Sequence, residues 1–220
     1  MTLLRPGPAD GDRAGSPWSA SAWLLVRGGR GQAALAPGGT LGGNQAGGRL
    51  LYRLDGALAL SGRAYVPLRR PRGAELAAGI DWRPVARLPV HLLAERRQDL
   101  GGEGRSAFAF TLYGGAEGRL PAGLRGEVYG QAGVVGTRSR DLFADGMGRV
   151  ERPIGRGVGI GGGLWGAAQP GAARLDTGPS MVWRPALPRT RLRLQADWRF
   201  RLAGDAAPGS GPALTVALDF

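Results

Sequence analysis

Two absences narrow what this sequence encodes. Cysteine does not occur among its 220 residues, which excludes a disulfide framework and any thiolate metal site. No apolar run reaches the roughly 18 residues that a membrane-spanning helix needs. The longest early run, Ala22 to Val26, is also too short for the core of a signal peptide. The sequence therefore offers neither a membrane helix nor a recognisable export signal.

Lysine is absent as well, so all 29 basic residues are arginine and the formal net charge is +12. A charge of this size suggests nucleic-acid binding as one interpretation. Codon bias in a GC-rich genome is the simpler explanation for arginine in place of lysine, but it does not explain where the arginines lie. Glycine is abundant, at 41 residues, without a triplet period, which excludes a collagen-like chain. We expect one domain whose glycines serve turns, bulges and crowded strands.

Apolar and polar residues alternate most clearly near the end of the chain. Between Arg189 and Arg201 one face holds Thr190, Leu192, Leu194, Ala196, Trp198 and Phe200, and the other holds arginines with Gln195 and Asp197. A helix would mix these two sets, whereas a strand separates them. The last residues repeat the pattern, with Leu214, Val216, Leu218 and Phe220 on one side.

Weaker copies of this alternation precede these two, separated by glycine- and proline-rich turns. They predict an all-β fold of about twelve strands, each of about ten residues, joined as an antiparallel up-and-down barrel. A tilted strand of ten residues spans about 25 Å along the barrel axis, which matches the height of the apolar band of an outer-membrane barrel. We expect residues 1–17 to form a flexible segment and residues 18–220 to form the barrel.

The alternation does not say which face points inward. A soluble barrel has apolar side chains inside, and a transmembrane barrel has them outside. Long strands, an arginine-rich polar face, and Trp82, Trp183 and Trp198 towards strand ends favour the transmembrane barrel. A soluble basic β-protein that binds nucleic acid remains the alternative.

In a transmembrane barrel the polar face lines the lumen. The candidate lumen and anion-binding residues are Arg63, Arg97, Arg125, Arg191, Arg193, Arg199, Arg201, Glu95, Glu127 and Asp197. Some of them must pair, because crowded guanidinium groups at low dielectric need carboxylate partners. The surplus of arginine predicts either an anion-selective pore or a salt-bridged plug that passes nothing.

Catalytic chemistry has little support in the sequence. His91 is the only histidine, and an outer-membrane lipid-modifying enzyme using His91 is the alternative to a polar lumen network, with Ser106 as its nearest serine. Gly157 to Gly162 matches the dinucleotide fingerprint without the helix that must follow it, so a glycine-rich strand explains it better. We predict no enzyme, no metal site and no cofactor.

Six short segments between Pro89 and Phe220 form a set with a family resemblance. They occupy residues 94–97, 129–136, 140–146, 168–179, 197–201 and 212–220. As a set they resemble the C-terminal outer-membrane barrel of the phage-adsorption and exopolysaccharide-export proteins, and more distantly the cellulose synthase operon outer-membrane protein. The resemblance implies a barrel in the cell outer membrane that serves as a pore or anchor for export of an exopolysaccharide or another anionic solute, and that phages exploit as a receptor.

The resemblance also implies partners. These are outer-membrane lipid, the barrel assembly machinery, a polysaccharide, and a periplasmic helical-repeat region that here belongs to a partner or to a missing N-terminal domain; no nucleic acid is expected. It further implies that the assembly machinery reads the last strand, with Leu214, Val216, Leu218 and Phe220 as the signal. An exported protein needs a leader, so we expect Met1 to belong to a fragment or a mis-started frame and Phe220 to be a true C-terminus.

Overall fold

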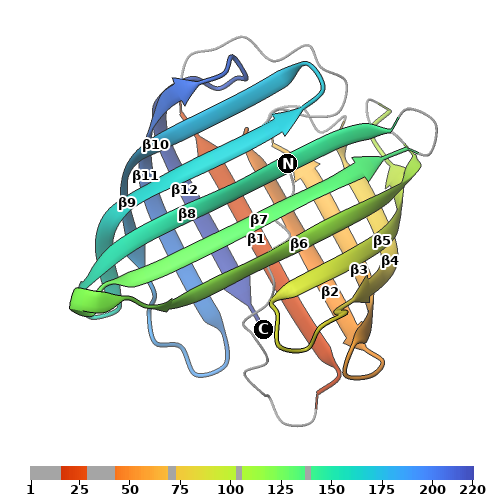
Figure 1. Cartoon of the computed structure of the whole chain (residues 1–220), viewed down its shortest axis with the longest axis horizontal. Coiled ribbons are helices and arrows are strands. Elements are labelled where there is room, and N and C mark those ends of the chain that lie inside the picture. Colours follow the sequence, from red (N-terminus) through yellow and green to blue (C-terminus); the bar gives the residue numbers. More distant parts are fainter. Residues whose placement is uncertain (1–15, 29–42, 69–72, 103–105, 137–139) are drawn as a thin grey trace.

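The computed structural model describes residues 16–28, 43–68, 73–102, 106–136 and 140–220. Twelve β-strands make up most of this part of the chain (Figure 1). They are β1 (Trp18–Arg27), β2 (Gln45–Arg53), β3 (Leu58–Pro67), β4 (Glu75–Trp82), β5 (Val90–Asp99), β6 (Ala107–Arg119), β7 (Arg125–Val135), β8 (Asp141–Gly155), β9 (Val158–Gln169), β10 (Ala172–Trp183), β11 (Arg191–Ala203) and β12 (Gly211–Asp219). In the described residues no helix is long and apolar enough to cross a membrane.

Every strand pairs antiparallel with its neighbours in sequence, and β1 pairs with β12, so the sheet closes into a barrel. The closing register runs from Ser21 opposite Asp219 to Arg27 opposite Ala213. The predicted antiparallel up-and-down barrel of about twelve strands is therefore confirmed. The predicted flexible segment, residues 1–17, lies outside the described residues except for Ser16 and Pro17.

The barrel is polar inside and apolar outside. On β11 the side chains of Gln195, Asp197 and Arg199 are buried, while Trp198 and Phe200 on the opposite face are about half exposed. The same alternation continues around the barrel and leaves a surface of exposed leucine, isoleucine, valine and aromatic side chains. This arrangement is that of a barrel in lipid, because water-soluble barrels place their apolar side chains inward.

The two ends of the barrel are similar in their exposed aromatic side chains. The proximal end is where β1 begins and β12 ends, and the distal end is the opposite one. Exposed aromatic side chains gather near both. Near the proximal end lie Trp18, Trp82, Trp183 and Phe220, and near the distal end lie Phe108, Phe110, Trp198 and Phe200. Two such belts are typical of side chains placed at the two membrane–water interfaces.

Short turns join many of the strands. At the proximal end, Asp55 accepts hydrogen bonds from the backbone N–H groups of Ala57 and Leu58, each at 2.7 Å, which fixes the turn between β2 and β3. These bonds stabilise the charged carboxylate and lower the pKa of Asp55. Arg156 and Gly157 connect β8 to β9 with φ values of 50° and 77°, the backbone of a two-residue hairpin turn.

Candidate functional site

The interior of the barrel holds an unusual number of charges. Among the described residues, buried charged side chains comprise six arginines and seven carboxylates: Arg27, Arg49, Arg63, Arg149, Arg174, Arg199, Asp81, Glu95, Glu127, Asp145, Glu151, Asp176 and Asp197. Burial of an unpaired charge costs several kcal/mol, so such groups must find partners. The pairs they form line the lumen, and those of Glu127 also reach across it.

Glu127 on β7 is the centre of the first of these contacts. It accepts hydrogen bonds from Arg149 on β8 and, at 2.7 Å, from Arg193 on β11. Arg149 also donates to the side chain of Gln195 on β11. Because β8, β9 and β10 lie between β7 and β11 in the sheet, these bonds run across the interior. We call these four residues the lumen crossbar.

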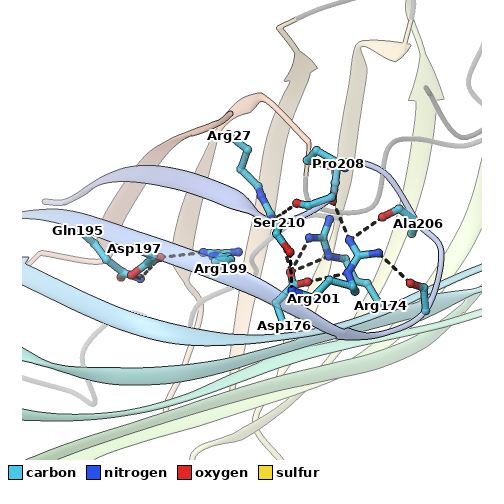
Figure 2. A network of polar contacts seen from close by, with 12 residues as sticks. Arg27, Arg174, Asp176, Gln195, Asp197, Arg199, Arg201, Ala206, Pro208 and Ser210 are labelled. Atoms are coloured by element: carbon cyan, nitrogen blue, oxygen red, sulfur yellow. Dashed lines mark hydrogen bonds and ion pairs between the residues drawn. The ribbon is translucent and has the colours of Figure 1, made fainter. Parts of the chain in front are cut away.

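Asp176 on β10 forms a second centre, near the distal end (Figure 2). Its carboxylate accepts hydrogen bonds from Arg27 on β1 at 3.2 Å, from Arg174 at 2.9 Å and from Arg201 on β11 at 2.8 Å. Arg201 also donates to the carbonyl oxygens of Ala206 and Pro208, both at 2.7 Å. We call Asp176 and its three arginines the Asp176 cluster. It joins three strands and holds the connection from β11 to β12.

Two further networks line the wall formed by β2 to β6. Arg49 donates to Asp81 and to Ser61, and its guanidinium lies 4.9 Å from the centre of the Tyr113 ring on β6. A second network comprises Arg63 and Arg97, both paired at 2.7 Å with Glu95. Arg63 also reaches Glu75 at 2.8 Å.

His91 belongs to the first of these networks. Its Nδ1 lies 2.7 Å from the carboxylate of Asp81, and its ring stacks on Tyr113 with a centroid distance of 5.0 Å. Ser106 lies near the distal end, where its hydroxyl accepts a hydrogen bond from the backbone N–H of Asp99, whereas His91 lies near the proximal start of β5. The structure thus does not bring this serine and His91 together. Within the described residues there is also no cluster of three or more potential metal ligands.

The structure places most of the sequence-predicted lumen residues in these networks. Ion pairs contain Arg63, Arg97, Arg193, Arg199, Arg201, Glu95, Glu127 and Asp197. The other two lie at the proximal ends of their strands, where Arg125 is half-buried and Arg191 is exposed. Leu214, Val216 and Leu218 lie on the outer face of β12, and Phe220 follows it. Gly159, Gly161 and Gly162 lie within β9.

Sequence reasoning missed four of the most deeply placed arginines, namely Arg27, Arg49, Arg149 and Arg174, together with Asp176. The alternation of Arg149 and Glu151 with the exposed Val150 was a usable signal for β8. No such signal existed for Arg27, because its strand carries Trp23 and Leu25 on the inner face and Leu24 and Val26 on the outer one.

The chemical consequence of this arrangement is electrostatic. The ion pairs of the described residues join ten arginines to seven carboxylates, and the arginines are Arg27, Arg49, Arg63, Arg97, Arg149, Arg174, Arg184, Arg193, Arg199 and Arg201. Several carboxylates are therefore shared between arginines. With the buried Asp145 counted as an eighth carboxylate, the ten arginines still leave an excess of positive charge. Such an interior favours anions over cations.

No protein-family model and no curated protein matches the chain significantly. Among solved structures it is similar to an outer-membrane channel from Pseudomonas putida F1, at 14% identity over 96% of this chain and 98% of that chain, with a TM-score of 0.48. It is also similar to the KdgM porin, at 8% identity over 92% of this chain and 98% of that chain, with a TM-score of 0.46. A third similar structure is Wzi from Escherichia coli, described as a carbohydrate-binding β-barrel involved in group 1 capsule assembly. Here the identity is 12% over 90% of this chain and 56% of that chain, with a TM-score of 0.34. At these values the likenesses carry no argument about function, and the predicted membership of the phage-adsorption and export family stays a prediction.

Proposed function

We propose that this protein is an outer-membrane barrel that conducts an anionic solute through an arginine-rich lumen. The observation that carries the proposal is the set of lumen ion pairs, in which ten arginines share seven carboxylates. Arginine-lined pores select anions, because the positive side chains replace part of the hydration of the ion. The apolar outer face and the two aromatic belts support placement in a membrane.

The lumen crossbar gives this conduit a closed state. Arg193 and Glu127 meet across the interior, so in this arrangement the pair narrows the path of an anion at this level. An anion that binds Arg149 and Arg193 competes with Glu127 for them. The proposal is therefore a gated conduit, in which the solute itself helps to open the path.

Planar-bilayer recording tests this proposal. The wild-type protein is expected to show small, infrequent, anion-preferring currents, and Glu127→Gln is expected to increase the conductance because it frees Arg149 and Arg193. Asp205→Asn is the matched control, since Asp205 is an exposed carboxylate of the connection between β11 and β12. Cation preference in the wild type, or silence of both the wild type and Glu127→Gln, contradicts the proposal.

We extend the proposal to an exopolysaccharide as the solute and to a helical-repeat partner in the periplasm, with use as a phage receptor as a secondary role. Support for this extension comes from the sequence resemblance, and the assembly machinery is proposed to read the last strand on the same ground. Deletion of the gene is expected to reduce surface polysaccharide. A strain that expresses Arg193→Glu in its place is expected to behave like the deletion, whereas normal polymer on both strains contradicts the extension.

A further inference from the structure

A second group of arginines surrounds the proximal mouth of the barrel. Arg53 ends β2, Arg119 ends β6, Arg125 begins β7 and Arg191 begins β11. By strand alternation these four side chains face the same way as Arg49, Glu117, Glu127 and Arg193. Arg49 lies four positions further into the barrel than Arg53, and the other three lie two positions further in than their mouth arginines. We call Arg53, Arg119, Arg125 and Arg191 the mouth arginines. They stand on four strands spread around the ring, so the mouth is basic on several sides.

The mouth arginines differ from the lumen arginines in having no partner. Within the described residues none of the four makes an ion pair or a side-chain hydrogen bond, whereas Arg193 and Arg149 a few positions deeper are both held by Glu127. Further arginines of the proximal end, such as Arg152 and Arg156, are exposed as well. Among the described residues, the carboxylates at this end outside the lumen networks are Asp55, Glu117 and Asp219, the last opposite Arg191 in the register, so positive charge predominates there.

The register of β6 and β7 sets two of the mouth arginines against each other. Arg119 on β6 lies directly opposite Arg125 on β7 in the register of the two strands. Directly opposed like charges destabilise a sheet, because their Cβ atoms lie only about 5 Å apart. Either arginine could be replaced by a neutral side chain without loss of a hydrogen bond. Two opposed cations that make no ion pair within the described residues are available to a negatively charged binding partner.

We propose that the proximal mouth is the capture site for a polyanionic chain, a linear polymer with repeated negative groups. The site rests on the proposed function, because it leads to the crossbar arginines and supplies the end from which the solute enters. The mouth arginines lie on the same side of their strands as the lumen residues. A polymer that enters the barrel therefore contacts them, whereas lipid headgroups lie on the opposite side of the wall. Several cations around one opening also suit a polymer that makes many weak contacts at once.

The test measures binding of dextran sulfate, with uncharged dextran as the comparison, to the detergent-solubilised barrel. Dextran sulfate is expected to bind at low salt and to dissociate as the salt concentration rises. Arg119→Gln with Arg125→Gln is expected to weaken binding about tenfold, because two charge contacts are lost. The same double variant is expected to unfold at a higher urea concentration than the wild type, since the opposed pair is removed.

The matched control is Arg96→Gln with Arg140→Gln, two exposed arginines near the distal end. It removes the same charge and is expected to leave binding within about twofold of the wild type. Equal losses in both double variants, or binding of uncharged dextran, overturn the capture site. This assay requires no current, so failure of the bilayer experiment with intact, mouth-dependent binding refutes the gated conduit and leaves the capture site standing.

Discussion

Individual glycines make room for aromatic side chains inside the barrel. Gly47 on β2 lies directly opposite Trp23 on β1, and a Cβ atom at Gly47 would lie 2.3 Å from the indole ring. On β9, a Cβ atom at Gly163 would lie 2.5 Å from the ring of Trp165. Both tryptophans are buried in the lumen. An aromatic ring that covers a glycine on the same face of a sheet shields the backbone. It occupies the space that glycine leaves open because it has no side chain.

This packing predicts the effect of one methyl group. Gly47→Ala is expected to destabilise the barrel by about 1–3 kcal/mol, because the Trp23 ring must move within a filled interior. Gly62→Ala is the matched control, since a Cβ atom there meets nothing within 4 Å. Urea unfolding in detergent, followed by tryptophan fluorescence, measures both. Equal stability of the two variants would show that the Trp23 ring is not confined.

At the scale of elements, the Asp176 cluster joins strands that are far apart in the sequence. Arg27 and Asp176 are separated by 149 positions, and both side chains are fully buried. Removal of one partner from a buried ion pair leaves the other charge unpaired, which costs more than the pair itself contributes. Here the removal of one carboxylate would leave three guanidinium groups facing one another.

Asp176→Asn is therefore expected to destabilise the barrel by about 3–5 kcal/mol. The connection between β11 and β12 is expected to loosen with it, because Arg201 loses its anchor while it holds Ala206 and Pro208. Limited proteolysis at residues 204–210, together with urea unfolding, measures both effects. Asp205→Asn serves as the control, and an Asp176 variant as stable as that control would contradict the prediction.

Most of the strands could be predicted from the local alternation of polar and apolar residues. The ion pairs of the site could not, because alternation does not say which strands face each other. The two faces of β11 were predictable because polar and apolar residues alternate strictly along it, although the alternation did not say which face points inward. The strand over Trp18–Arg27 was harder to predict, because Trp23 and Leu25 interrupt the polar positions of its inner face. Pairs such as Arg193 with Glu127 depend on the closure of the ring, which sets the strands that face each other.

At the scale of the whole molecule, the barrel has the polarity of a soluble protein reversed. Its charged residues pair inside, and leucines such as Leu164 on β9 stay about half exposed on the outer face. Exposed apolar surface that continues around a protein in this way is stable only against lipid or another apolar surface. The position of an outer side chain along the strand should therefore decide how well it tolerates a charge.

Leu164→Arg is expected to cost about 2–4 kcal/mol in folding into lipid vesicles, because the residue lies in the middle of β9 and would carry its charge deep into the bilayer. Leu54→Arg, in the proximal turn after β2, is expected to cost about 1 kcal/mol or less. Urea titration of vesicle-bound protein measures both costs. A monomer that stays dissolved without detergent, or equal costs for the two variants, would contradict placement in a membrane.

The closing contact between β1 and β12 separates the barrel's assembly into two kinds of step. Every other strand pair joins neighbours in sequence, so hairpins can form one after another with little loss of chain entropy. The pairing of Ser21 with Asp219 instead brings together positions almost 200 residues apart. Until it forms, the protein is an open sheet with two unpaired edges, the form most prone to pair with other chains. Ring closure is therefore the step at which slow folding and aggregation compete.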